Sequence, residues 1–110
     1  MANKKFLPYA VEQSIKELGS NIRTARLRRN ISLVELSERL GVHRTVLSDA
    51  EHGKPGTSIS VYVGMLWVMD LLTEFTNVAA PDQDSHGLAL ARFDERERAS
   101  SPRKGLNNDF

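Results

Sequence analysis

The sequence predicts an all-α fold, in which five helices form a helix-turn-helix domain between flexible termini. Three observations predict it. Ser14 and Ser32 are each followed by Glu three residues on, which is capping-box spacing at a helix start. Gly41 leaves only a three- to four-residue turn between two short segments of helical apolar spacing. Residues 59–72 are apolar almost all round and are long enough for a helix.

Composition limits the chain to one small domain with a tail. It has 110 residues and no cysteine, which excludes disulfides and cysteine metal sites. No apolar run is long enough to span a membrane and no signal peptide opens the chain, so we expect a cytoplasmic protein. The net charge is only +1, but residues 1–53 carry nine Lys/Arg against six Asp/Glu. This basic excess suits a nucleic acid, and a solvated helix face is the alternative.

The expected organisation has three parts. Residues 1–13 form an N-terminal arm, because Pro8 argues against a continuous helix there. Residues 14–80 form the helix-turn-helix domain that binds DNA and dimerises. Residues 81–110 form a C-terminal tail of alternating charges that is partly disordered, above all at its end.

The first predicted helix runs from Ser14 or Leu18 to about Arg29, and the second follows Ser32 and stops at Gly41. In the first helix, Ile15, Leu18, Ile22, Ala25 and Arg29 recur at helical spacing. In the second helix, Leu33, Leu36, Ser37 and Leu40 are expected to face inward.

The third predicted helix starts near His43 and ends at Glu51 or His52, with Val46, Leu47 and Ala50 buried. Its polar residues gather at the opposite side of its first turns. A recognition helix presents those turns to base edges in the major groove. The predicted base-contacting residues are His43, Arg44, Thr45 and Ser48, in which Arg44 can donate two bonds to guanine. Asp49 repels phosphates and must face a cytosine amino group, a basic side chain or solvent.

The fourth predicted helix covers residues 59–72, with Thr57 or Ser58 as its cap, and a short fifth helix covers 73–80. Residues 59–72 contain many β-branched residues, so a β-strand is the competing prediction for this segment. A helix that is apolar on all sides is buried on more than one side, and a second subunit best explains the outer face. The predicted dimer interface comprises Tyr62, Met65, Leu66, Trp67, Met69 and Leu72.

Residues 18–72 resemble the Xre/lambda-repressor-like helix-turn-helix domain. The matching residues are Ile22-Arg-x-Ala-Arg26, Ser32-x-x-Glu35-Leu36, Leu40-Gly41-Val42, Arg44, Leu47-Ser48 and Glu51-x-Gly53. The resemblance implies a homodimeric repressor that binds inverted repeats in a double-stranded DNA operator. It also implies a buried structural ion pair between Arg26 and Glu51. Phosphate contacts are expected from Arg28 and Arg29 of the basic cluster and, by the resemblance, from Ser32, His52 and Lys54. The sequence departs from the family at Leu33, where a phosphate-binding Gln is usual, and at His43, where a small cap is usual.

A looser pattern resembles the HipB-like antitoxins, through LGSNIRTARLRR, SISVYVGMLWVMDLL and DSHGLALARF. This resemblance implies the antitoxin of a toxin-antitoxin pair, which represses its own operon and binds a HipA-like kinase toxin. The alternative is a stand-alone Xre-type repressor of phage or chromosome, without a toxin partner. No enzyme is expected, because no catalytic motif stands out. No cofactor or metal is expected either, since His43, His52 and His86 lack metal-ligand spacing.

Overall fold

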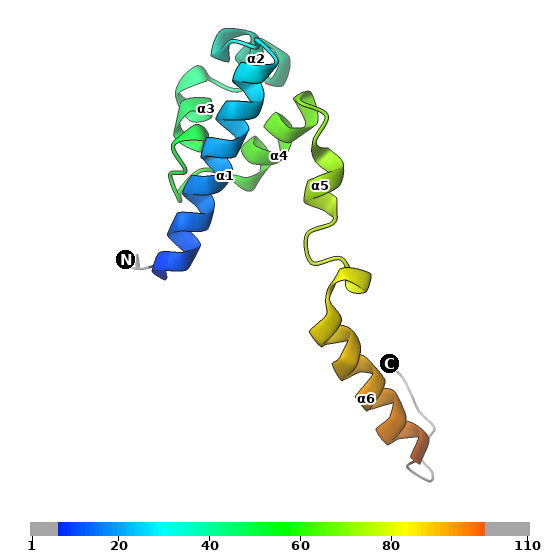
Figure 1. Ribbon diagram of the computed structural model, residues 1–110. Coiled ribbons are helices and arrows are strands. Elements are labelled where there is room, and N and C mark those ends of the chain that lie inside the picture. Colours follow the sequence, from blue (N-terminus) through cyan, green and yellow to red (C-terminus); the bar gives the residue numbers. More distant parts are fainter. Residues whose placement is uncertain (1–6, 101–110) are drawn as a thin grey trace. The chain divides into compact units, whose positions relative to one another are not determined.

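The computed structural model describes residues 7–100, and within them every regular element is a helix, which confirms the all-α fold (Figure 1). The chain divides into two compact units, one ending at Phe75 and the other starting at Thr76. The helices are α1 (Tyr9–Arg28), α2 (Leu33–Leu40), α3 (Arg44–Glu51), α4 (Ile59–Val68), α5 (Leu72–Thr76) and α6 (Ser85–Ser100), with a 3-10 turn η1 (Pro81–Gln83) before α6. The described part of the chain has six α-helices where the sequence predicted five. None of them is long and apolar enough to cross a membrane.

The start of α1 corrects the prediction. The helix begins at Tyr9, five residues before Ser14, so residues 9–13 are not part of an arm. Pro8 fits at this boundary because its carbonyl accepts bonds from the amides of Val11 and Glu12, at 3.0 and 3.1 Å, while its missing N–H costs nothing there. The Ser14 hydroxyl lies inside the helix and donates to the Ala10 carbonyl at 2.8 Å. The rest of the expected arm, residues 1–6, lies outside the described residues.

The pair α2 and α3 forms with its predicted caps. The Ser32 hydroxyl accepts from the Glu35 amide at 3.0 Å, and Gly41 ends α2 in the left-handed region at φ 67°. His43 caps α3 with its ring, as Nδ1 accepts from the Thr45 amide at 3.1 Å. The turn between the two helices is therefore only three residues long, as expected for a helix-turn-helix unit.

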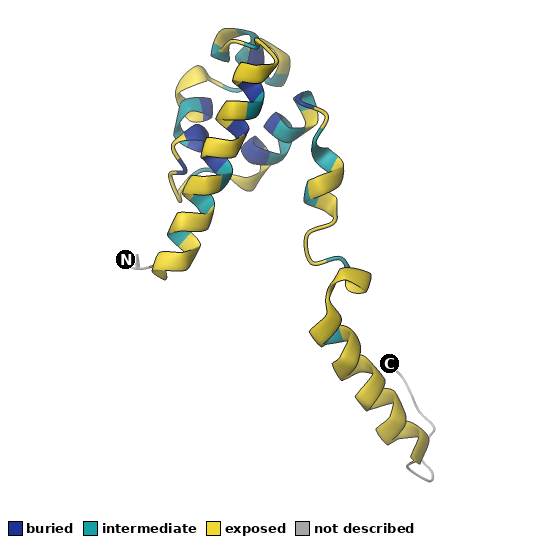
Figure 2. Cartoon of the chain, viewed as in Figure 1, coloured by how far each residue is buried: buried dark blue, intermediate teal, exposed yellow. Residues whose placement is uncertain are grey.

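The core lies in the first unit, among α1, α2, α3 and α4 (Figure 2). Its buried side chains come from all four helices and from the cap residue that follows α4: Ile22, Leu36, Leu47, Ala50, Val61, Tyr62, Met65 and Met69. One predicted buried residue is wrong. Val46 is 36% exposed, because Leu47 and Ala50 turn it toward solvent. In α1, Arg26 takes a buried position and Arg29 is exposed.

Three residues of the predicted dimer interface lie in the core of their own domain. Tyr62, Met65 and Met69 are at most 4% exposed within one chain, because they cover the other helices of that domain. Leu66 and Leu72 are half-buried, and Trp67, at 62% exposed, is the residue of the predicted set that faces outward.

The fourth helix ends earlier than predicted, at Val68 rather than Leu72. Asp70 adopts the left-handed region with φ 61°, and the Leu71 amide then bonds back to the Leu66 carbonyl at 2.8 Å. This is a Schellman-type end, which Asp tolerates better than most residues. The predicted helix at 73–80 is correspondingly shorter and lies at Leu72–Thr76.

The second unit carries α6, a helix in a segment predicted to be partly disordered. Asp84 starts it, because its carboxylate accepts from the Gly87 amide at 3.0 Å. Every residue of α6 is exposed except the half-buried Gly87 (Figure 2). The disorder predicted for the end of the chain concerns residues 101–110, outside the described residues.

Candidate nucleic-acid interface

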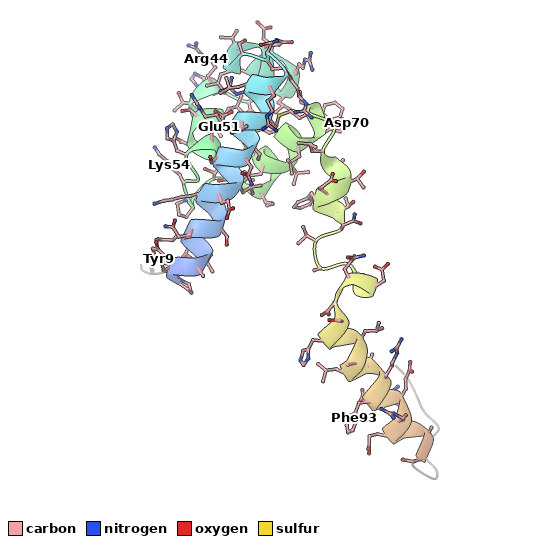
Figure 3. The ribbon with its side chains drawn as sticks, in the orientation of Figure 1. Tyr9, Arg44, Glu51, Lys54, Asp70 and Phe93 are labelled. Carbon is pink, nitrogen blue, oxygen red and sulfur yellow. The ribbon has the colours of Figure 1, made fainter. Side chains whose placement is uncertain are left out.

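The first turn of α3 presents polar side chains from a helix that is anchored on its other side. Leu47 and Ala50 have no exposed surface, whereas Arg44 and Thr45 are exposed. Arg44 lies at the start of α3 and Lys54 just beyond its end (Figure 3). The buried pair fixes how the helix is rotated about its axis. It therefore fixes the direction in which Arg44 and Thr45 point, without using either side chain in the fold.

His43 occupies the cap position of α3 and fills it with its ring. Its Nδ1 accepts the Thr45 amide, so the neutral ring carries its proton on Nε2. The ring thereby satisfies one of the free amides of the first turn, and Nε2–H remains to donate to a base or phosphate oxygen. His43 can cap α3 and contact DNA with different atoms.

His52 has the opposite arrangement at the other end of α3. Its Nδ1 donates to the Ser48 carbonyl at 2.8 Å, and it lies 3.5 Å from the Ser48 hydroxyl. The neutral ring therefore has a bare Nε2, which accepts but does not donate. A phosphate oxygen needs a donor, and in this arrangement the Nδ1 proton of His52 is already used by the Ser48 carbonyl.

Asp49, one of the two acidic residues of α3, is paired with Lys54. The Lys54 Nζ lies 3.0 Å from Asp49 Oδ1, and the side chains are 64% and 36% exposed. The sequence predicted that Asp49 faces a cytosine amino group, a basic side chain or solvent, and in the structure it faces a basic side chain. One of the three ammonium protons of Lys54 is used here, which leaves donors for a phosphate.

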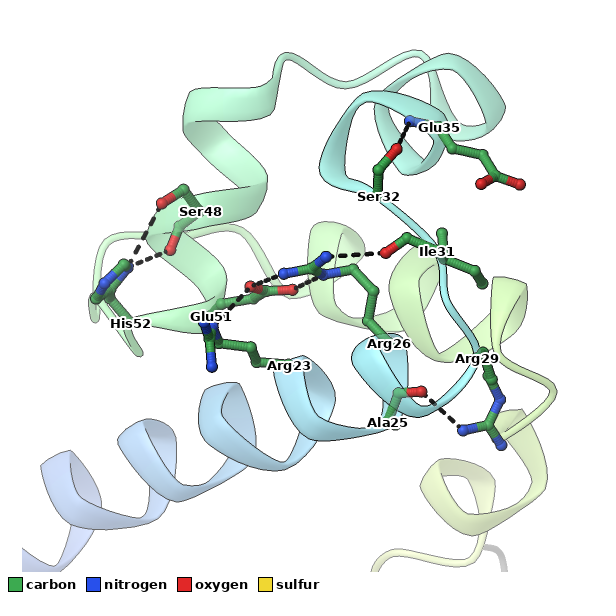
Figure 4. A network of polar contacts seen from close by, with 10 residues as sticks. All are labelled: Arg23, Ala25, Arg26, Arg29, Ile31, Ser32, Glu35, Ser48, Glu51 and His52. Carbon is green, nitrogen blue, oxygen red and sulfur yellow. Dashed lines mark hydrogen bonds and ion pairs between the residues drawn. The ribbon is translucent and has the colours of Figure 1, made fainter.

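A buried ion pair holds α3 against α1 (Figure 4). Arg26 donates to both Glu51 oxygens, at 2.6 and 3.0 Å, and each residue is 7% exposed. Arg26 also donates to the Ile31 carbonyl at 2.9 Å, which ties the connection between α1 and α2 to the same guanidinium. This is the pair that the family resemblance implied, and it holds the C-terminal end of α3 against α1.

Close backbone contact between α1 and the end of α3 requires glycine. A side chain at Gly19 would collide with the carbonyl oxygens of Ala50 and Glu51. Gly53, at φ 68°, lies against the backbone of Lys16 in the same way. The two glycines let α1 lie directly on the C-terminal end of α3.

Arg23 is a cation beside α3 that the predicted site left out. Its Nε is 4.0 Å from Glu51 Oε1, and its side chain is 59% exposed (Figure 4). The signal was available in the sequence, because Arg23 lies three residues before Arg26 and so on the same side of the helix.

The predicted phosphate contacts Arg28 and Arg29 lie elsewhere. Arg29 donates to the Ala25 carbonyl at 3.0 Å, on the other side of Arg26 from Ser48 and His52 (Figure 4). Arg28 follows Arg26 by two residues, about 200° around the helix, and points away from α3. The structure brings Arg23, His52 and Lys54 to the end of α3, and it brings neither Arg28 nor Arg29 there.

Comparison with known families gives a match over this part of the chain. Residues 22–63 match the Helix-turn-helix family. The match starts within α1, contains α2, the turn and α3, and ends within α4, so less than half of the chain is covered. A helix-turn-helix segment supports a DNA-binding transcriptional regulator. Comparisons with curated proteins and with solved structures gave no match. Within residues 7–100, no group of three or more His, Cys, Asp or Glu side chains could hold a metal ion.

Proposed function

We propose that the protein is a sequence-specific transcriptional repressor that inserts the first turn of α3 into the major groove. One observation carries this proposal: Arg44 and Thr45 are exposed on a helix whose opposite side is locked by Leu47 and Ala50. A guanidinium in this position can donate to guanine O6 and N7, and the Thr45 methyl suits a thymine methyl.

The proposed DNA contacts fall into two groups. His43, Arg44, Thr45 and Ser48 contact bases from α3. Ser32, His52 and Lys54 contact phosphates from the two ends of the helix-turn-helix unit, and Arg23 joins them because of its place beside Glu51. Arg28 and Arg29, which point elsewhere, are expected to add long-range attraction at most.

Two copies of the domain are proposed to act together on inverted repeats. One short helix reads few base pairs, and a two-fold dimer places a second reading helix on the other half-site. Occupation of such an operator blocks access to the DNA beneath it, which is repression.

Selection of binding sites from random double-stranded DNA tests the proposal. The intact protein is expected to enrich a short sequence, and Arg44→Ala to lose preference at one base pair of each half-site. Arg39→Ala is the matched control, because Arg39 is another exposed arginine, on α2, where it pairs with Glu35 at 2.9 Å. Failure to enrich any sequence, or equal selectivity of Arg44→Ala and the intact protein, contradicts the proposal.

We also propose, as a second function, that the repressor is the antitoxin of a HipA-like kinase toxin. The supporting observation is apolar surface that DNA reading does not use: Leu7 and Val11 are 43% and 41% exposed, and Val11 lies in a shallow, open groove with Ala10, Ser14, Ile15 and Leu18. The alternative remains a stand-alone repressor with no toxin.

Co-expression with a candidate kinase from the same genome tests the antitoxin function. Growth rescue by the intact chain and by Arg44→Ala, with loss of rescue by Val11→Asp, is expected if the groove binds the toxin. Rescue that needs Arg44 reflects repression alone. No rescue by the intact chain contradicts the antitoxin role and leaves DNA binding untouched.

A further inference from the structure

The last helix, α6, has large apolar side chains that are exposed to solvent. Leu90 and Phe93 of α6 are 56% and 57% exposed, and the described part of this helix buries no residue. A lone helix of 16 residues is marginal in water, since packing of an apolar face supplies most helical stability in proteins. A surface that covers Leu90 and Phe93 is therefore expected.

Four residues of α6 form one narrow stripe, which we call the α6 seam: His86, Leu90, Phe93 and Glu97. Their spacing of four, three and four residues is that of the a and d positions of a coiled coil. At 100° per residue they fall within an arc of about 60°. The other five charged residues of α6 lie outside this arc. They are Arg92, Asp94, Glu95, Arg96 and Arg98, of which Asp94 and Arg98 pair with each other at 3.6 Å.

The α6 seam is complementary to itself when it is reversed. Its spacing reads the same in both directions, about a centre between Leu90 and Phe93. We propose that α6 pairs in antiparallel orientation with α6 of a second copy of this chain. Leu90 then packs on the partner's Phe93, and the His86 ring donates to the partner's Glu97 carboxylate. The two-fold axis repeats both contacts.

Charge decides the orientation. In a parallel pair, Glu97 would meet the partner's Glu97, and His86 the partner's His86. In the antiparallel pair each of these meets its complement instead. The charged residues beside the α6 seam are also compatible with this orientation. In an antiparallel pair, residues on the same side of the seam face each other, so Asp94 faces the partner's Gly87 and Arg96 faces the partner's Ala89. No like charges meet along the contact.

This inference rests on the homodimer of the proposed function, and it specifies which surface joins the two copies. It places the contact in the second unit, whereas the sequence placed it on residues 62–72. It makes no use of α3 or of the base contacts, so each can fail without the other.

Crosslinking of the full chain through introduced cysteines tests the pairing directly, because the sequence has no cysteine of its own. The double variant H86C/E97C is expected to form a covalent dimer on mild oxidation. Neither H86C nor E97C alone is expected to do so, since identical residues lie about 16.5 Å apart along an antiparallel pair. Crosslinking by the single variants at the same rate shows a parallel pair and overturns the proposal.

The second test changes the charges at positions 86 and 97 and measures the dimer dissociation constant by sedimentation equilibrium. His86→Glu puts two carboxylates together and is expected to raise the dimer dissociation constant about tenfold, counting two contacts. Adding Glu97→Lys is expected to restore the original value. Glu95→Lys, outside the arc, is the control and should change little.

The outcomes separate the inference from the proposed function. A dimer that forms without the H86C/E97C crosslink and without response to charge exchange overturns the α6 seam and leaves the dimeric repressor intact. A chain that is monomeric at high concentration and on its selected DNA overturns both the α6 seam and the two-fold operator. Sequence selection through Arg44 is scored independently in either case.

Discussion

The guanidinium of Arg26 and the carboxylate of Glu51 meet inside the protein through two hydrogen bonds of 2.6 and 3.0 Å, although 25 residues separate them in the chain. Both side chains are more than nine-tenths buried, at 8% and 3% exposed. Removal of either partner leaves a buried charge without its counterion, which is the costly way to break an ion pair.

The first prediction concerns this pair. Glu51→Ala and Arg26→Ala are each expected to lower the free energy of unfolding by about 3–5 kcal/mol. Urea denaturation followed by circular dichroism measures the loss. The exposed pair Arg39–Glu35 is the control, where Arg39→Ala should cost at most ~1 kcal/mol. Equal losses at both pairs would show that burial does not govern the effect.

The second prediction concerns the close approach of α1 to α3. Gly19→Ala puts a methyl group onto two backbone carbonyls, at Ala50 and Glu51, which cannot move aside as a flexible side chain can. A loss of about 1–3 kcal/mol is expected from this overpacking. Gly56→Ala is the matched control, because nothing lies within 4 Å of the added methyl there and stability should hold or rise. The prediction fails if thermal unfolding ranks the two variants the other way.

The third prediction separates the two roles of His43. His43→Ala removes the acceptor for the Thr45 amide and is expected to cost about 0.5–2 kcal/mol of stability. His43→Asn keeps a capping oxygen, so stability should return while the donor at Nε2 stays lost. Comparison of unfolding free energy with affinity for the selected operator distinguishes these effects. Full recovery of both by His43→Asn would mean that the ring only caps the helix.

The fourth prediction concerns the cations of α1. Arg23→Ala, beside the end of α3, is expected to lower the salt dependence of DNA binding by about one unit of slope. Arg28→Ala removes the same charge from the far side of the helix and should leave the slope nearly unchanged. Titrations at several salt concentrations give both slopes. A larger effect at Arg28 would restore the basic cluster of the sequence prediction as the phosphate contact.

The fifth prediction concerns Lys54 and Asp49. Lys54→Ala removes a phosphate donor and also exposes the Asp49 carboxylate to the DNA backbone. Its loss of affinity is therefore expected to exceed that of Lys54→Ala measured in an Asp49→Asn background. A double-mutant cycle on a non-specific duplex isolates this difference. Additive losses would show that the pair has no bearing on DNA.

Local signals in the sequence predicted the helix-turn-helix unit well. Ser32, Gly41 and His43 lie at the helix ends where their side chains or φ angles are needed, so short-range chemistry determines those boundaries. The spacing at Ser14 failed because Pro8 offers an equally good start one turn and a half earlier, and α1 extends to it. When two residues can each begin a helix, local sequence patterns alone do not show which of them does.

Long-range contacts explain the other differences. An apolar helix needs cover, but its sequence does not say whether that cover comes from the same chain or another. Met65 and Met69 therefore read as interface residues although their own domain buries them. The basic cluster likewise gave four arginines without their directions. The pairing of Arg26 with Glu51 shows which side of α1 faces α3. Arg23 lies on that side, whereas Arg28 lies about 200° around the helix from Arg26.

Helix α3 is held against α1 at its C-terminal end and is exposed at its first turn. Glu51, Ala50 and Gly53 contact α1, while Arg44 and Thr45 at the first turn are exposed. Exchange of those two residues should thus change the preferred DNA sequence at little cost in folding. The scaffold can be retargeted, in the laboratory or by natural drift, through a handful of codons.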